Sequence, residues 1–166
     1  MVATQLAVRQ PGTGTRVLWL GDTLIEVLLD SAATAGQLSI LRVEAVGQGS
    51  GAPPHTHTNE DEAFIVLEGT VTFTCDGTDA TIGAGGSVFL PRGLCHTYRL
   101  ATPRAVMLML FTPAGMENMF LEGGEPATPT TVPQPPAGPP SPDMVAKLVA
   151  LTARYGCTLA VPGNPS

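Results

Sequence analysis

The sequence predicts an all-β domain built as an antiparallel sandwich or barrel. Two observations support this prediction. Glycine (19) and proline (16) are abundant among the 166 residues, and only 13% of the residues are charged. Such a composition suits short strands joined by turns better than long surface helices. The chain has the usual length of a single domain and is long enough to bury a hydrophobic core.

Short runs with strand composition succeed one another between residues 16 and 112. They read RVLWL, TLIEVLL, QLSILRVEAV, EAFIVLEG, TVTFTC, ATIG, SVFLP, HTYRL and AVMLMLF. Turn-forming residues separate them, including residues 48–51, the pair Asp76 and Gly77, and residues 83–86. The regular spacing is typical of a sandwich or barrel, and the absence of an internal repeat indicates one barrel rather than two.

The chain after residue 123 has a different character. Residues 124–141 are too rich in proline for a strand or helix, so we expect a semi-extended linker or strap there. Ser141 is suited to cap a helix, Pro142 to begin it and Gly156 to end it, which predicts one helix at about 142–155. The expected organisation is therefore a barrel over 1–123, a linker over 124–141, and a helix with a tail over 142–166.

Charge and targeting signals exclude several classes of function. The chain has one lysine, Lys147, and seven scattered arginines, so no basic stripe is available for nucleic acid. The net charge of −6 favours neutral or apolar ligands. No signal peptide or long apolar run is present, so we expect a cytoplasmic protein without a membrane segment. Cys75, Cys95 and Cys157 form no paired motif and are expected to be reduced thiols.

The three histidines of the chain, together with an acidic turn, predict a metal site. His55 and His57 are two residues apart, so on a strand both imidazoles point to the same face. Glu62 begins the next strand, and His96 begins another strand some thirty residues later. Glu60 and Asp61 offer competing carboxylates within the same turn.

These residues resemble the two sequence motifs of the cupin superfamily. The first motif, G-x5-H-x-H-x4-E-x6-G, is matched by Gly49, His55, His57, Glu62 and Gly69. The second, G-x5-P-x-G-x2-H-x3-N, is matched by Gly85, Pro91, Gly93 and His96, but Leu100 replaces its final asparagine. Among the three acids, Glu62 alone keeps the motif's spacing to Gly69. The resemblance covers residues 49–100 directly.

The resemblance implies a jelly-roll barrel that binds one divalent transition metal inside. The metal ligands would be His55, His57, Glu62 and His96, and this donor set suits Fe, Mn, Ni, Co, Cu or Zn. Four protein ligands leave one or two exchangeable positions, which favours catalysis over a purely structural site.

Strand alternation predicts which side chains line the pocket. Residues at every second position after Glu62 and His96 lie on the same face of their strands as these two ligands, and one face of the last strand is expected to join them. The predicted pocket residues are Phe64, Val66, Tyr98, Leu100, Met107, Met109 and Phe111. Tyr98 is a candidate for proton transfer, with plain packing as the alternative. The apolar patch at 116–121 is interpreted equally as a lid, a dimer contact or packing.

Size, motif details and the C-terminal tail resemble the small quercetinase-like cupins. That resemblance implies a dioxygenase that cleaves a flavonol or related aromatic enol with O₂ and releases carbon monoxide, with Glu62 both binding the metal and accepting the enol proton. The alternatives are a non-oxidative polyketide cyclase or isomerase and a non-catalytic ligand-binding cupin. We also expect a homodimer, because pairing covers exposed sheet edges.

Overall fold

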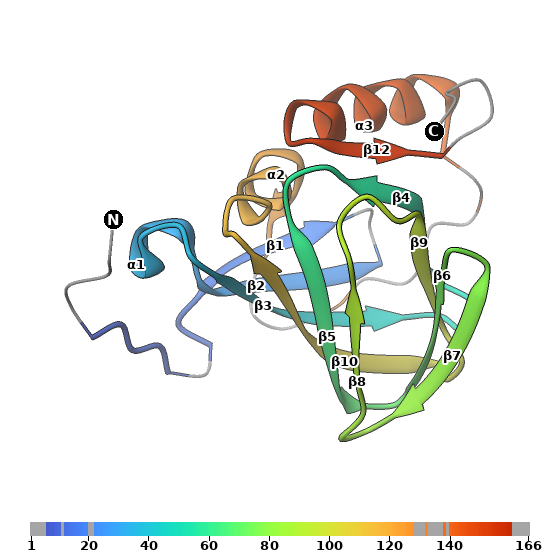
Figure 1. The fold of residues 1–166 in the computed structure, drawn as a ribbon, viewed down its shortest axis with the longest axis horizontal. Helices are drawn as coiled ribbons and strands as arrows, with labels where there is room; N and C mark the ends of the chain where they lie inside the picture. Colours follow the sequence, from blue (N-terminus) through green and yellow to red (C-terminus); the bar gives the residue numbers. More distant parts are fainter. Residues whose placement is uncertain are drawn as a thin grey trace.

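The structure is a computed structural model, which describes residues 6–10, 12–19, 22–127, 132, 138 and 140–160. Within these ranges the predicted all-β jelly-roll class is confirmed. Two antiparallel sheets face one another and enclose the core between them (Figure 1). None of the described helices has the length and apolar character needed to cross a membrane.

The larger sheet contains seven strands in the described part of the chain. In spatial order they are β11 (Glu125–Pro126), β1 (Thr15–Trp19), β2 (Thr23–Leu29), β3 (Ser39–Val46), β10 (Arg104–Thr112), β5 (Asp61–Glu68) and β8 (Ser87–Leu90). Along β3, buried and half-buried residues alternate strictly, as expected for a strand with one face in the core. Most of the predicted apolar runs correspond to these strands.

The smaller sheet contains five described strands, and the sequence had not predicted all of them. Their order is β12 (Cys157–Leu159), β4 (Gly51–His57), β9 (His96–Leu100), β6 (Thr70–Cys75) and β7 (Thr78–Gly83). The assignment of Gly51 to a turn was wrong, because β4 begins there and continues through Pro53 and Pro54. A register shift between Ala52 and His55 accommodates the two prolines.

Gly51 allows β4 to lie close against β9. A Cβ atom at this position would lie 1.8 Å from the carbonyl oxygen of Tyr98, so any other residue would push the two strands apart. The contact brings His55 opposite His96 in the sheet register. A glycine therefore helps to set the spacing between two of the candidate ligands.

Three helices lie in the described ranges, and only the longest was predicted. α1 (Ser31–Thr34) and α2 (Glu117–Gly123) are too short to give a periodic signal. α3 (Pro142–Arg154) matches the predicted 142–155. The Ser141 hydroxyl accepts a hydrogen bond from the Met144 N–H at 3.3 Å, and Gly156 follows the helix with φ +72°.

We call α3 and β12 together the C-terminal cover. β12 pairs with β4, and Leu148, Val149 and Leu151 of α3 pack against the core. Figure 1 shows α3 and β12 lying across one end of the two sheets. The prediction that 124–141 contains no strand was wrong at its start, because Glu125 and Pro126 pair with β1 as the short strand β11. Most of the rest of this segment lies outside the described residues, as does the end of the tail at 161–166, so the strap and the proposed domain boundaries stay predictions.

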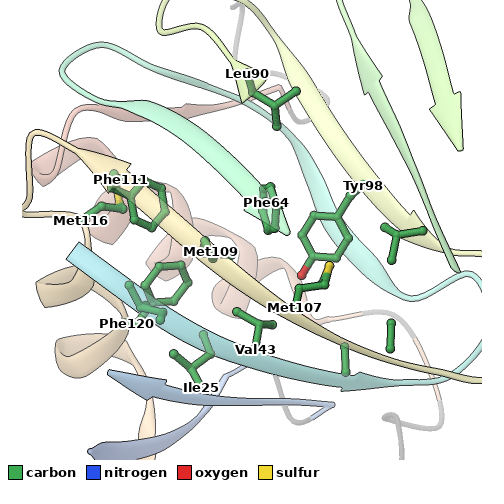
Figure 2. Packing of buried hydrophobic residues seen from close by; sticks show 14 of the residues in the cluster. Ile25, Val43, Phe64, Leu90, Tyr98, Met107, Met109, Phe111, Met116 and Phe120 are labelled. Atoms are coloured by element: carbon green, nitrogen blue, oxygen red, sulfur yellow. The ribbon is translucent and has the colours of Figure 1, made fainter. Parts of the chain in front are cut away.

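Aromatic side chains from both sheets meet in the core. The ring of Phe64 on β5 lies 5.0 Å from that of Phe73 on β6 and 5.5 Å from that of Tyr98 on β9. Phe111 and Phe120 approach each other at 6.4 Å nearer the C-terminal cover. Figure 2 shows Phe64, Tyr98 and Met107 packed side by side on one side of this core. This packing fixes the sheets that carry the candidate ligands.

Candidate metal centre

His55 and His57 lie on the inner face of β4, as their spacing predicts. Because successive strand residues point to opposite faces, the intervening Thr56 faces away from them. The rings of His55 and His57 are 4.9 Å apart and nearly perpendicular. The His55 Nδ1–H donates to the carbonyl oxygen of Pro53 at 2.8 Å, which leaves its Nε2 lone pair free for a metal.

Glu62 and His96 complete a cluster around one point. Glu62 is the second residue of β5 and His96 is the first residue of β9. Glu62 Oε2 lies 3.0 Å from His96 Nε2, 3.5 Å from His57 Nε2 and 3.9 Å from His55 Nε2. The four ligand atoms all lie within 4.8 Å of one another. Three Nε2 atoms and one carboxylate oxygen therefore converge from three strands.

The protonation states of this cluster fit a divalent metal. Burial lowers the pKa of His55 to about 4, so its imidazole is neutral at pH 7. Burial by itself would raise the pKa of Glu62, but its contacts with His57 and His96 lower that pKa to about 2. The buried His57 Nε2 has no hydrogen-bond partner. A neutral imidazole at His55, an ionised carboxylate at Glu62 and an unsatisfied ligand atom at His57 together match what a transition metal needs.

The three consecutive acids of the turn have three different environments. Asp61 turns outward and pairs with Arg92 at 2.8 Å. Glu60 is buried behind His57, with its Oε2 at 3.8 Å from His57 Nδ1. Only the Glu62 carboxylate reaches the point where the three Nε2 atoms meet. The geometry therefore supports the same choice among the acids as the motif spacing.

The cluster opens into a small apolar cavity of about 60 Å³. Among the predicted pocket residues, Tyr98, Met109 and Phe111 line this cavity. Phe64, Val66, Leu100 and Met107 do not line it, although all four are buried in the core between the two sheets. Strand alternation indicates which face of a strand a residue lies on, but not its position along the barrel. Leu100, the departure from the second motif, is thus a core residue.

Several cavity residues were not predicted as pocket residues. They come from the N-terminal strands, from α2 and from the C-terminal cover, and include Trp19, Ile25, Phe120, Leu148, Thr152 and Cys157. Trp19 and Ile25 lie in predicted strands, and Leu148 and Thr152 lie in the predicted helix, but none of them was expected at the cavity. Phe120 belongs to the apolar patch at 116–121, for which a lid was one of three interpretations. Its ring packs edge-on against Trp19 at 5.1 Å. No local signal identifies the others, because long-range packing brings them to the metal cluster.

Tyr98 brings a protonated phenol to the cavity. The residue is buried, and burial together with the nearby charge of Glu62 raises its pKa well above the usual value. Its hydroxyl therefore stays protonated at physiological pH and is suited to donate a hydrogen bond to an oxygen of a bound molecule.

Comparisons with known proteins agree with this geometry. The family model described as the cupin domain matches residues 42–112, which contain all four candidate ligands. These comparisons support a small protein of the cupin superfamily, with the match to the family model confined to residues 42–112. The solved structure of KdgF from Halomonas sp. superimposes with a TM-score of 0.61 at 15% identity, over 69% of this chain and 99% of that chain. The polyketide cyclase RemF from Streptomyces resistomycificus gives 0.56 at 20% identity, over 67% and 81% respectively. At these identities the two likenesses concern the fold alone.

Two curated proteins are similar to this chain in sequence. Quercetin 2,3-dioxygenase of Bacillus subtilis (strain 168) is 29% identical over 119 residues, which is 72% of this chain and 35% of that protein. An uncharacterized protein of Aquifex aeolicus (strain VF5) is 33% identical over 71 residues, which is 42% of this chain and 59% of that protein. The matched region is therefore about a third of the length of the Bacillus enzyme.

Proposed function

We propose that this cupin is a metal-dependent dioxygenase that cleaves a flavonol or a related aromatic enol with O₂. The observation that carries the proposal is the cluster of three histidines and one glutamate at the wall of an apolar cavity. The similarity to a quercetin dioxygenase over 72% of the chain supports the oxidative chemistry. A bound aromatic ring would find apolar walls, while its oxygen atoms would face the cluster.

Each group of the site has a defined task under this proposal. His55, His57, Glu62 and His96 would hold one divalent transition metal (Fe, Mn, Ni, Co, Cu or Zn), which supplies a Lewis acid and exchangeable positions for substrate oxygen and O₂. The Glu62 carboxylate, ionised above pH 2, accepts the proton of the enol hydroxyl.

The remaining groups of the site orient the substrate and exclude water. The protonated Tyr98 hydroxyl donates a hydrogen bond to a substrate oxygen. Met109 and Phe111 border the cavity beside the cluster, where they would pack against the aromatic ring. Removal of water from this space strengthens the electrostatic interactions of Glu62 with the substrate.

Two other functions remain as alternatives, each with an observation in its favour. Glu62 and Tyr98 face one cavity as a proton acceptor and a proton donor, an arrangement that also suits a non-oxidative cyclase or isomerase of polyketide-like enols. The small volume of about 60 Å³ favours a non-catalytic cupin, because pockets for drug-sized ligands span about 300 Å³ or more. The dioxygenase proposal therefore requires the cavity to enlarge when substrate enters.

We also propose that the protein is a homodimer. Ile65 and Leu67 on β5 and Phe89 on β8 are exposed on neighbouring strands of the larger sheet. A cluster of exposed apolar side chains on a sheet surface is typical of a contact with another chain. Light scattering after size exclusion should give a dimer, and Phe89→Glu should give a monomer.

Oxygen consumption tests the proposed reaction directly. The metal-free protein is reconstituted separately with Fe(II), Mn, Co, Ni or Zn and supplied with quercetin, while O₂ uptake and flavonol absorbance are followed together. We expect uptake with at least one metal and none in His96→Ala. Asp61→Asn is the matched control, because the Asp61 carboxylate binds Arg92 and points away from the cluster. Stoichiometric metal binding without uptake refutes the dioxygenase and favours the cyclase or isomerase.

A further inference from the structure

The three histidines of the cluster differ in what their outer nitrogen contacts. The Nδ1–H of His55 donates to the Pro53 carbonyl at 2.8 Å, and that of His96 donates to the Leu94 carbonyl at 2.9 Å. In both cases a carbonyl two residues earlier holds the ring with Nε2 toward the cluster. His57 Nδ1 is buried and has no hydrogen-bond partner. Its ring therefore lacks the orienting contact that the other two rings have.

The Glu60 carboxylate lies on this outer side of the His57 ring. Its Oε2 is 3.8 Å from His57 Nδ1, whereas Glu62 Oε2 is 3.5 Å from His57 Nε2 on the inner side. The ring is thus placed between two carboxylates. Glu60 is not among the four residues whose ligand atoms converge, so its position does not suit a further ligand.

Glu60 is 5% exposed, and a carboxylate buried to this extent needs a hydrogen-bond donor. Its Oε2 has no hydrogen bond among the described residues, and a buried carboxylate oxygen without one is costly. Nearby Glu117 is also buried, but its two oxygens accept from the N–H groups of Ser31 and Gly115, each at 2.7 Å. Glu117 thus has a structural role already. The Arg92 side chain also interacts with the charge of Glu60 but donates its hydrogen bonds to Asp61 and Thr112, whereas His57 Nδ1–H is directed at Glu60 Oε2 from 3.8 Å.

We infer that Glu60 is a positioning residue that accepts a hydrogen bond from His57 Nδ1–H and holds His57 Nε2 toward the metal. The two atoms need to approach by about 0.6–1 Å to reach hydrogen-bond distance. When the Glu60 carboxylate accepts this hydrogen bond, the proton stays on His57 Nδ1, so the lone pair of Nε2 is free to bind the metal. A carboxylate acceptor also makes the imidazole a stronger donor to the metal. The inference rests on the proposal that the cluster binds a metal.

Zinc affinity measured without any substrate tests this role. The dissociation constant of Zn²⁺ is determined by competition with a chromophoric chelator for wild type, Glu60→Ala, Glu60→Gln and Asp61→Asn. Removal of an outer carboxylate partner weakens metal binding by about 10–100-fold, so we expect a loss of this size in Glu60→Ala. Glu60→Gln keeps an acceptor oxygen and should lie between wild type and Glu60→Ala. Asp61→Asn removes one negative charge from the same turn and should bind like wild type.

A second measurement separates positioning from a merely structural role. In the zinc-loaded protein labelled with ¹⁵N, a His57 Nδ1 proton that binds a carboxylate should exchange slowly with water and resonate downfield. Glu60→Ala should lose this signal and keep the corresponding signals of His55 and His96, whose partners are backbone carbonyls. If Glu60→Ala does not fold, Glu60→Gln gives the same comparison with the shape of the side chain retained.

The outcomes distinguish the two proposals. If wild type binds no zinc, the proposed function fails and the role of Glu60 fails with it. If wild type binds zinc and Glu60→Ala binds it equally well, the role of Glu60 alone is refuted. Equal losses in Glu60→Ala and Asp61→Asn also refute it, because they indicate an effect of net charge rather than a contact with His57.

Discussion

Loosening the C-terminal cover is expected to open the cavity beside the metal cluster. Glu122 at the end of α2 accepts a hydrogen bond from the Tyr155 hydroxyl at 2.6 Å and forms an ion pair with Arg154. Because Arg154 and Tyr155 lie at the end of α3, this one carboxylate connects the cover to α2. Glu122→Ala removes the connection and leaves the cavity wall itself unchanged.

The contacts set the size of the effect. The ion pair of Glu122 and Arg154 is exposed to solvent, so it contributes only about 0.2–1 kcal/mol. The hydrogen bond from Tyr155 adds a net contribution of roughly 0.5–1.5 kcal/mol. Removing both contacts therefore costs about 1–2 kcal/mol, which raises the fraction of molecules with a detached C-terminal cover by roughly 5–30-fold. Apolar packing of α3 on the core remains, so the protein should stay folded.

Hydrogen exchange measured by mass spectrometry would detect the opening. Peptides covering 142–156 should exchange roughly 5–30-fold faster in Glu122→Ala, while peptides from β5 and β9 keep the wild-type rate. Tyr155→Phe should produce a smaller increase, and Glu125→Gln, an exposed position on the neighbouring β11, should produce none. Unchanged exchange in α3 refutes the reasoning. Equal acceleration in the core strands refutes it too, since that indicates loss of global stability.

Four further predictions concern stability. A free Zn²⁺ concentration 100 times the dissociation constant should raise the free energy of unfolding by about 2.7 kcal/mol. This corresponds to an increase in Tm of roughly 5–11 °C in thermal unfolding scans, and His57→Ala should abolish the increase. In the metal-free protein, burial lowers the pKa of His55 from 6.5 to about 4. Between these two pH values the unfolded chain binds a proton that the folded chain does not bind. The free energy of unfolding should therefore fall by up to about 3 kcal/mol as the pH drops from 6.5 to 4. The Glu62 carboxylate, with its pKa at about 2, stabilises the fold above pH 4.5, and this contribution is lost as the pH falls toward 2. Urea unfolding at several pH values checks the His55 and the Glu62 predictions. A free energy of unfolding that stays constant between pH 6.5 and 4 contradicts the His55 prediction. Phe64→Ala should lower the free energy of unfolding by about 3–5 kcal/mol, because Phe64 is fully buried against two aromatic rings. Met144→Ala, at an exposed position outside the proposed dimer contact, should change it little in the same assay.

Local patterns were sufficient for much of the fold. The β-rich runs and their turns predict the class, and the caps at Ser141 and Gly156 predict α3 because helix ends depend on neighbouring residues. The two prolines in β4 obscured the start of that strand, since proline usually interrupts a ladder. β12 has only three residues, too few for alternation to be recognised, and it forms a strand because β4 offers it an edge.

The candidate ligands and the cavity wall were predictable to different degrees. The spacing of His55, His57 and Glu62 is local, so strand geometry and the motif are enough to select them. The cavity wall depends on which residues lie at the same depth between two sheets, so alternation selected Met107 although it lies in the core. Leu148 and Thr152 reach the cavity only because α3 packs across the end of the barrel.

The sequence by itself determined the all-β class, the terminal helix and the identities of four candidate metal ligands, because periodicity, capping and motif spacing act over a few residues. The tertiary structure decided the size of the cavity, the cover above it and the separate environments of Glu60, Asp61 and Glu62. Those features arise from contacts between segments far apart in the chain. Such contacts depend on strand register and packing, and no short stretch of sequence specifies them.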